Sequence, residues 1–251
     1  MISASIVIIT LNEERNIERC LNSVKDISDD IIVVDSYSND KTKEICKKYD
    51  VNFIEYDWKG YSETKNYGNS IAKYDWILSI DADEVVSEKL KKSLLNVDLN
   101  SGFDGFYLKR LNNYCGKWIK HSGWYPDRKI RLWNKNKAKW EGEVHEKIVL
   151  EKQSEIGCLK GNLLHYSYYT IKEHIKRIEK YSDMSAQEYF KKGKKSNIFK
   201  IYVAPVFKFI LNYFIRLGFL DGYYGFIICK LTAYTTFLKY YKLKKISNIE
   251  H

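Results

Sequence analysis

No Cys-x-x-Cys pair occurs in this 251-residue sequence, and its five cysteines are scattered along the chain. An odd number of widely spaced cysteines suits neither a disulfide framework nor a zinc site. Cys20 and Cys46 fall on the apolar faces of predicted helices. We therefore expect reduced thiols in the protein core, which is typical of cytosolic proteins.

Long uncharged apolar runs are also absent from the sequence. Its first apolar run begins within a few residues of the N-terminus and has the length of a strand, so we expect no signal peptide. A spanning helix needs about 20 mostly apolar residues with few or no charges. The apolar C-terminal region is interrupted by Lys200, Lys208, Arg216, Asp221 and Lys230. We therefore expect no membrane-spanning helix.

Negative charge is scarce only in the last third of the chain. Residues 1–169 hold 26 Lys+Arg and 26 Asp+Glu, whereas residues 170–251 hold 16 and 6, so this last part carries the whole formal net charge of +10. A neutral body with a basic tail indicates an anionic partner, either phospholipid or nucleic acid. The alternative is a basic helix face that is merely solvated. We predict two domains, residues 1–169 and a helical extension over residues 170–251.

Apolar runs of strand length alternate with helical patterns through the first hundred residues. The runs cover residues 5–10, 30–35, 51–56 and 76–80. Ile17, Cys20, Leu21 and Val24 lie on one face of the first helix, and Ser62 can cap the third, which runs to about Ala72. This order predicts an α/β fold with a mostly parallel sheet and helices on both faces.

Two aspartates one residue apart, Asp81 and Asp83, follow the apolar run that begins at Trp76. Ligands of open α/β sheets bind at the carboxyl ends of the strands. Because two carboxylates this close repel each other, a countercharge is needed, and a divalent cation shared with substrate phosphates would supply it. The alternative is a polar turn in which the aspartates cap the next helix.

The pattern changes after residue 100, where strands are expected at residues 105–110, 129–133 and 159–166 without helices between them. We expect loops to carry four tryptophans, at positions 118, 124, 133 and 140. Aromatic rings on loops beside a phosphate site would suit the C–H faces of sugars. The alternative, which is better for any single ring, is that the tryptophans fill a second core layer.

Five motifs occur in an informative order. They are Ile8-Ile-Thr-Leu-Asn-Glu-Glu14, Ile32-Val-Val-Asp-Ser-Tyr-Ser-Asn-Asp40, Asp81-Ala-Asp-Glu84, Trp140-Glu-Gly-Glu-Val-His-Glu146 and Leu164-His-Tyr-Ser-Tyr168. Together they resemble the GT-A core of the family 2 inverting glycosyltransferases. The last two resemble the bacterial branch that contains the lipopolysaccharide core glucosyltransferases. The resemblance covers roughly residues 3–180.

The resemblance implies a nucleotide-sugar site at the first three motifs. The residues that it assigns to this site are Thr10, Asn12, Glu13, Asp35, Lys65 and Asp81. Thr10, Asn12 and Glu13 would grip the base, while Asp35 would meet the base or ribose and Asp81 the ribose. Lys65 stands where the family often has an arginine that helps to hold the nucleotide. Lysine lacks the bidentate fork of that arginine.

The resemblance also implies a metal site and a general base. Asp83 would bind Mg²⁺ or Mn²⁺, and His165 would complete the metal and diphosphate site. The pair at positions 145 and 146 stands where the family commonly has Glu-Asp, which assigns the base to Glu146 and leaves Glu141 and Glu143 as rivals. Independently of the family, an inverting transfer needs one carboxylate to deprotonate the acceptor and a cation to neutralise the departing diphosphate.

The extension predicts helices with an unusual surface. Residues 170–192 have the spacing of an amphipathic helix with Ile171, Ile175, Ile178 and Tyr181 inward, and residues 191–195 look like a linker. The apolar, aromatic residues 198–241 should form two helices broken near residues 218–222. We expect an interfacial hairpin whose cationic side chains reach lipid headgroups. The alternative is a helical pair that packs on the catalytic body or forms a homodimer.

These features favour a glycosyltransferase that is cytoplasmic and peripheral on the inner face of the cytoplasmic membrane. It would move a sugar with inversion from a nucleotide-diphosphate sugar, with UDP the expected nucleotide, to a lipid-linked or lipopolysaccharide-core glycan. A nucleic-acid-binding protein would have no use for the aspartate pair. A nucleotidyltransferase would show a glycine-rich, basic loop where residues 11–14 are acidic. A protein acceptor is a further alternative.

Overall fold

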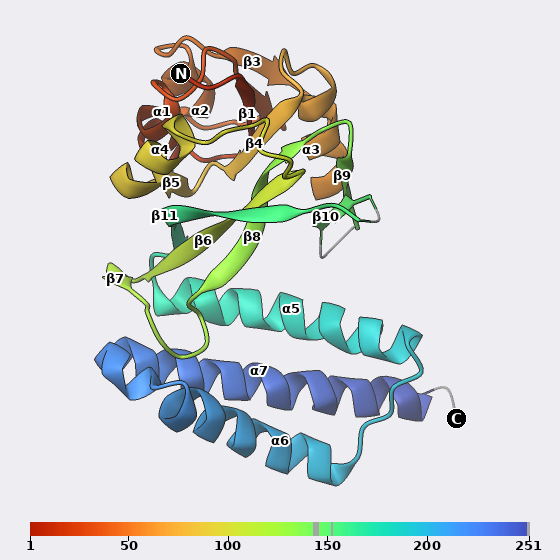
Figure 1. Ribbon diagram of the computed structural model, residues 1–251. Helices are drawn as coiled ribbons and strands as arrows, with labels where there is room; N and C mark the ends of the chain where they lie inside the picture. Colours follow the sequence, from red (N-terminus) through yellow and green to blue (C-terminus); the bar gives the residue numbers. More distant parts are fainter. Residues whose placement is uncertain (143–145, 152, 250–251) are drawn as a thin grey trace. The chain divides into compact units, whose positions relative to one another are not determined.

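The computed structural model describes residues 1–142, 146–151 and 153–249 and divides into two compact units (Figure 1). Unit 1 comprises residues 1–110 and 127–165, and unit 2 comprises residues 111–126 and 166–251. The boundary crosses two long strands, β6 (Gly105–Tyr114) and β11 (Ile156–Tyr168). Residues 111–126 therefore belong with the C-terminal helices.

Parallel strands form half of the main sheet, in the order β3 (Asn52–Glu55), β2 (Ile31–Asp35), β1 (Ala4–Thr10) and β4 (Trp76–Asp81). β8 (Asp127–Asn134) pairs antiparallel with β4 and with β6, and β5 (Glu84–Val86) pairs antiparallel with β11. The short β7 (Lys117–Trp118) pairs with β6, while β9 (Ala138–Glu141) and β10 (Lys147–Leu150) form a separate two-stranded sheet. The carboxyl ends of β1, β2 and β4 therefore lie at one edge.

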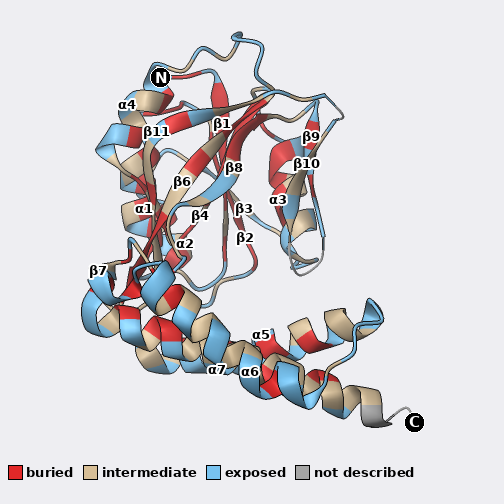
Figure 2. Cartoon of the chain, turned by 60° about the horizontal axis from the view of Figure 1, so that its bottom comes forward, coloured by how far each residue is buried: buried red, intermediate tan, exposed pale blue. Residues whose placement is uncertain are grey.

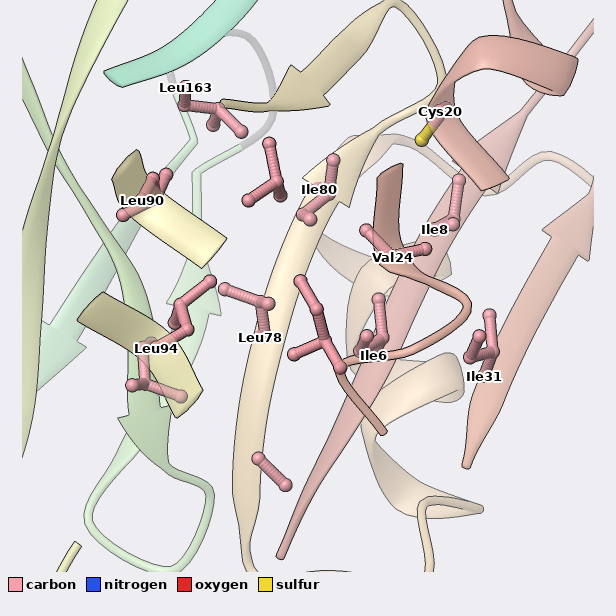
Figure 3. Packing of buried hydrophobic residues seen from close by; sticks show 14 of the residues in the cluster. Ile6, Ile8, Cys20, Val24, Ile31, Leu78, Ile80, Leu90, Leu94 and Leu163 are labelled. Atoms are coloured by element: carbon pink, nitrogen blue, oxygen red, sulfur yellow. The ribbon is translucent and has the colours of Figure 1, made fainter. Parts of the chain in front are cut away.

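Helices cover both faces of the parallel half because successive side chains of a strand point to opposite faces. Ile6 and Ile8 of β1 pack with α1 (Ile17–Val24) and α4 (Glu88–Leu95), as Figure 3 shows for the buried cluster. Val7 belongs to the opposite cluster, beside α3 (Tyr61–Ser70). A Cβ at Gly68 of α3 would lie 2.5 Å from Val7 Cγ1. Glycine is therefore required for this close approach of α3 to β1.

The predicted α/β fold is confirmed, with helices on both faces of the parallel half of a mixed sheet and with a C-terminal helical region. Two details of the helices differ from the sequence expectation. The helix that holds Cys46, α2, is short and covers only Thr42–Cys46, and α3 begins after Gly60 with no side-chain cap, so the predicted cap at Ser62 is wrong. The hydroxyl of Ser62 instead donates a hydrogen bond to the carbonyl oxygen of Gly142, at 2.5 Å.

The tryptophans lie mainly on strands and not on loops. Trp118 is on β7, Trp133 on β8 and Trp140 on β9. Trp133 and Trp140 are buried and meet edge to face, with ring centroids 5.5 Å apart. The core interpretation is therefore correct for these two rings.

Unit 2 is built on three helices, α5 (Ile171–Lys191), α6 (Ile198–Ile210) and α7 (Gly222–Ile249). α6 continues into a π-helical turn, η1 (Leu211–Ile215), and the break before α7 is a 3₁₀ turn, η2 (Gly218–Asp221), where a break was expected. Thr170 and Asn197 cap α5 and α6 by accepting backbone hydrogen bonds. Tyr114, Ile119 and Ile228 form the buried centre of an aromatic cluster.

Two predictions about the extension are corrected. Ile175 and Tyr181 of α5 are 44% and 45% exposed, because the helix buries a stripe with small and polar side chains instead (His174, Ile178, Ser182 and Ala186). By length and composition, residues 198–215 are apolar enough to cross a membrane, since they hold only two charged residues, Lys200 and Lys208. The expectation that no helix is long and apolar enough is therefore wrong.

Candidate functional site

The strand register brings several predicted residues to one edge of the sheet. Thr10 pairs with Asp35 across β1 and β2, and Ile9 pairs with Asp81 across β1 and β4. In the part of the chain that the structure describes, the buried hydroxyls of Thr10 and Ser36 have no hydrogen-bond partner. Burying a hydroxyl without a partner costs free energy. Unpartnered hydroxyls at the carboxyl edge of a parallel sheet are consistent with a ligand pocket.

The loops that follow β1 and β2 bind each other. The backbone N–H of Asn12 donates to Ser38 Oγ at 2.8 Å, and the Asn12 side chain accepts from the N–H of Asn39 at 2.9 Å. Asn12 has a φ of 55°, a left-handed conformation that asparagine tolerates better than most residues. The buried carboxylate of Asp35 accepts from both the N–H and the hydroxyl of Ser38, at 2.7 and 2.5 Å. Asn12 and Asp35 thus shape one loop surface together.

Glu13 contributes to the same loop in a different way. Its N–H donates to Thr42 Oγ1 at 2.9 Å, and its carboxylate accepts from the side chain of Asn16 at 2.6 Å, just before α1. These bonds join the loop after β1 to the starts of α1 and α2. The structure therefore groups Glu13 with Asn12 in the loop after β1.

Asp81 is held by two cations that come from distant parts of the sequence. Lys65 Nζ of α3 lies 2.9 Å from Asp81 Oδ1, and Arg131 of β8 donates to Asp81 Oδ2 at 2.6 Å. Burial would raise the pKa of Asp81, but Arg131 and Lys65 hold that pKa well below its usual value. Asp81 is therefore ionised, and the protein itself supplies its countercharge.

Arg131 extends this cluster into the interior through residues that the sequence analysis missed. The same nitrogen that binds Asp81 donates to Glu84 at 2.8 Å, and Glu84 is fully buried. Glu84 also accepts from the N–H of Asp81 at 3.0 Å and lies 3.5 Å from Arg110. Burial lowers the pKa of Arg131, but the two carboxylates raise it above its usual value. A signal was present, because Arg131 stands between Ile130 and the buried Leu132 in a strand.

Lys65 also connects Asp81 to the proposed base. Its side chain is 2% exposed, and Nζ lies 3.4 Å from Glu146 Oε1 and 4.3 Å from the centre of the Trp140 ring. A neighbouring α3 residue, Asn66, exchanges two hydrogen bonds with the Trp140 backbone, at 2.9 and 3.1 Å. One face of α3 therefore fixes β9 and places Glu146 near Asp81.

Two other glutamates, Glu141 and Glu143, are alternative candidates for the base. Glu143 lies outside the described residues, as does His145. The Glu141 side chain on β9 is 47% exposed and pairs with Lys139 at 3.2 Å. Among the described candidates, Glu146 is the carboxylate that joins the Asp81 cluster.

Asp83 and His165 form the second predicted pair. His165 Nε2 lies 3.2 Å from Asp83 Oδ2, and the side chains are 15% and 21% exposed. The register places His165 of β11 beside Glu84 of β5, which brings its ring to the end of the Asp81–Glu84 turn. One carboxylate and one imidazole fit a divalent cation that completes its coordination with phosphate oxygens and water. Within the described residues no group of three or more acidic, histidine or cysteine side chains could enclose a metal.

Comparison with known proteins identifies the family of the chain. Residues 5–152 match the sequence model of the family described as glycosyl transferase family 2. The chain belongs to this family. It is 33% identical over 254 residues to an uncharacterized glycosyltransferase of Rickettsia typhi, covering 97% of this chain and 87% of that one. It is 29% identical to the lipopolysaccharide core biosynthesis glycosyltransferase LpsC of Rhizobium meliloti, covering 93% and 89%.

Among solved structures, S. aureus TarS in complex with UDP-GlcNAc is similar, with a TM-score of 0.48 and 14% identity over 96% of this chain and 92% of that one. The family model, which covers more than half of the chain, confirms the predicted family. The family match covers the residues that build the Asp81 cluster, from β1 to β10.

Proposed function

We propose that this family 2 glycosyltransferase moves a sugar with inversion from a nucleotide-diphosphate sugar to a lipid-linked or lipopolysaccharide-core glycan. The observation that carries the proposal is the cluster in which Lys65 lies between Asp81 and Glu146, beside the Asp83–His165 pair. It offers a fixed anion, a candidate base and a candidate cation site in one unit. We expect UDP as the nucleotide.

In the proposed donor site, Thr10, Asn12, Glu13 and Asp35 line the loops that receive the base and ribose. The unpartnered hydroxyl of Thr10 is a group that such a ligand could satisfy. Asp81, kept ionised by Lys65 and Arg131, can accept hydrogen bonds from the ribose hydroxyls. In this proposal Lys65 acts by placing a positive charge beside Asp81. Lysine cannot form the bidentate contact of the family's arginine, and Arg131, which also pairs with Asp81, offsets part of that loss.

In the proposed reaction, Glu146 accepts the proton of the acceptor hydroxyl as that oxygen attacks the anomeric carbon. No covalent nucleophile is needed, because a single displacement inverts the centre. A divalent cation, Mg²⁺ or Mn²⁺, held by Asp83 and His165 would neutralise the charge of the departing diphosphate. Lys65 restrains Glu146, because Lys65 Nζ lies 3.4 Å from Glu146 Oε1.

The acceptor and the location are inferred from one relative and from the charge of the C-terminal region. LpsC, the relative at 29% identity, is described as acting in lipopolysaccharide core biosynthesis. The excess of positive charge after residue 169 suits an anionic membrane surface. We therefore place the enzyme in the cytoplasm, peripheral on the inner face of the cytoplasmic membrane, and keep a protein acceptor and a homodimer as alternatives.

Calorimetric titration of UDP- and GDP-sugars, with Mn²⁺ and with a chelator, tests the donor and metal assignments. One nucleotide sugar should bind more tightly with Mn²⁺, and Asp83→Asn should abolish that gain while circular dichroism shows an intact fold. Asp50→Asn, at an exposed position, is the matched control and should behave as the wild type. Unchanged Mn²⁺-dependent affinity in folded Asp83→Asn protein would refute the metal assignment.

A further inference from the structure

Unit 2 presents an apolar face to solvent along α6, η1 and η2. Eight of its side chains are 54–70% exposed, namely Ile198, Phe199, Tyr202, Val206, Phe207, Phe214, Ile215 and Leu220. Figure 2 shows the exposed colour along α6. Soluble proteins scatter exposed apolar residues, and a contiguous patch of large side chains marks an interaction surface. We therefore expect this apolar face to bind a partner.

A cationic hollow opens beside that face, within the same unit. It has a volume of about 380 Å³, and its lining includes Lys120, His121 and Arg216 together with Ile215 and Leu217. Ile215 belongs to both features, so the apolar face runs into the hollow without interruption. Lys120 and Arg216 are exposed. Cations at the end of an apolar surface are the arrangement expected for a charged headgroup that is attached to hydrocarbon.

A buried carboxylate holds the loop that carries two lining residues of the hollow, Lys120 and His121. Asp221 is 3% exposed and accepts from the N–H groups of Lys120 and His121 at 3.2 and 2.9 Å, and from Ser122 Oγ at 3.3 Å. Its Oδ1 also lies 3.1 Å from His121 Nδ1. These bonds tie the loop over residues 120–122 to η2. The carboxylate is turned to the loop, which leaves the side chains of Lys120 and Arg216 available to a ligand.

Arg216 is held against the same loop. Its carbonyl oxygen accepts from the N–H of Ser122 at 3.1 Å, and a Cβ at Gly123 would lie 2.5 Å from Arg216 Nη1. Gly123 also has a φ of 76°, in the left-handed region that favours glycine. The backbone of this turn therefore favours glycine, and the arginine side chain lies beside it, where Nη1 also donates to Asn212 Oδ1 at 3.3 Å.

The net charge of unit 2 favours an anionic bilayer over a second copy of the chain as the partner of this face. The residues of unit 2 include 18 Lys+Arg and 6 Asp+Glu, a formal net charge of +12, whereas those of unit 1 include 24 and 26. A second copy would bring the same excess of positive charge to the contact, which repels. An anionic bilayer attracts it, and each Lys or Arg near such a surface contributes favourably.

We infer that this surface docks on a bilayer, with the phosphate of a lipid headgroup in the hollow of Lys120, His121 and Arg216 and with hydrocarbon against Phe207 and Ile215. The inference rests on the proposed function, because it places the enzyme where a lipid-linked acceptor would be found. It does not require that the bound lipid is the acceptor.

Co-sedimentation of the full chain with vesicles tests the inference. Binding should be strong with phosphatidylcholine that contains phosphatidic acid and weak with phosphatidylcholine alone. Lys120→Gln combined with Arg216→Gln should weaken the binding about thirty-fold, from the contribution of two cations near the membrane. The matched control is Lys176→Gln with Lys180→Gln, two exposed lysines of α5, which should lose much less. Phe207→Gln with Ile215→Gln should weaken binding to both kinds of vesicle.

Three results would overturn the inference. Equal losses in the Lys120/Arg216 variant and in the Lys176/Lys180 control would show diffuse attraction without a headgroup site. Complete competition by inorganic phosphate at constant ionic strength would indicate a soluble phosphate ligand. A full chain that ignores vesicles and sediments as a dimer, which Phe207→Gln with Ile215→Gln splits, would assign the face to a second copy. Nucleotide-sugar titration of the same proteins separates this question from the proposed activity, because donor binding should be unchanged in every variant.

Discussion

Replacing Arg131 by methionine tests the idea that the protein, and not a metal, balances Asp81. The change removes the guanidinium that lies 2.6 Å from Asp81 and 2.8 Å from Glu84 while keeping most of its buried volume. Arg131 is 3% exposed and Glu84 is fully buried, so solvent cannot replace the lost charge. Removing one partner of a buried pair typically costs about 3–5 kcal/mol. Lys65 and Arg110 remain nearby, so we expect a value near the lower end, about 3 kcal/mol.

The effect must also depend on pH in a defined direction. The folded-state pKa of Asp81 is lowered, so its contribution to stability is present above the ordinary carboxyl pKa and is lost as the pH falls through the folded-state value. Without Arg131, burial pushes the pKa of Asp81 upward. Once this carboxyl is protonated it no longer needs a cation. The destabilisation by Arg131→Met should therefore shrink as the pH falls below about 4.

Hydrogen–deuterium exchange of the β1 and β4 amides measures the opening of unit 1 alone, which suits a chain of two units. Arg128→Met, at an exposed position of the same strand, is the matched control and should change the opening free energy by less than about 0.5 kcal/mol. Glu84→Gln should restore part of the loss in the Arg131→Met background. A cost below about 1 kcal/mol at neutral pH, or a cost that does not shrink in acid, would refute the charge-balance argument.

Two further predictions concern the base and a buried histidine. Glu146→Gln keeps the shape and removes the basicity, so transfer should fall by roughly a hundred- to ten-thousand-fold while calorimetry shows unchanged donor binding; a loss confined to Glu143→Gln would move the base. Burial, and to a lesser extent Arg177, lowers the pKa of His174 from 6.5 to about 4. The unfolded state therefore takes up this proton at a higher pH than the folded state does. As the pH falls from 6.5 to about 4, the free energy of unfolding of unit 2 should drop by up to roughly 3 kcal/mol. His174→Gln should flatten that slope in exchange of the α5 amides, and an unchanged slope would assign the titration elsewhere.

The parallel half of the fold was predictable from sequence because its signals are local. Each apolar run is short, is bounded by polar residues and is followed by a helical period, so the strands at Ala4–Thr10 and Trp76–Asp81 were placed within a residue. The motif order also predicted the family, which the comparison confirms. The roles of individual site residues stay predictions, although the register brings Thr10 beside Asp35 and Ile9 beside Asp81.

The antiparallel half carried the contacts that local patterns could not reveal. Arg131 reaches Asp81 only because β8 pairs with β4 across more than fifty intervening residues. The α5 prediction failed for a related reason. Apolar spacing selected Ile175 and Tyr181, but α7 packs on the stripe through Ile178 and Ala186, where small side chains permit a close approach. A helix face is chosen by its partner as well as by its own hydrophobicity.

The two aspartates that dominate the sequence have opposite surroundings, and this difference bears on where a cation can bind. Asp81 already lies within 2.9 Å of Lys65 and 2.6 Å of Arg131, so a third positive charge there would be repelled. In the described part of the chain, Asp83 contacts His165, and a neutral histidine ring can itself bind a metal through a ring nitrogen. A cation should therefore choose Asp83, one residue beyond the strand-end carboxylate that the protein has neutralised. The same argument predicts that Asp81→Asn leaves Mn²⁺-dependent donor binding measurable by calorimetry, whereas Asp83→Asn abolishes it.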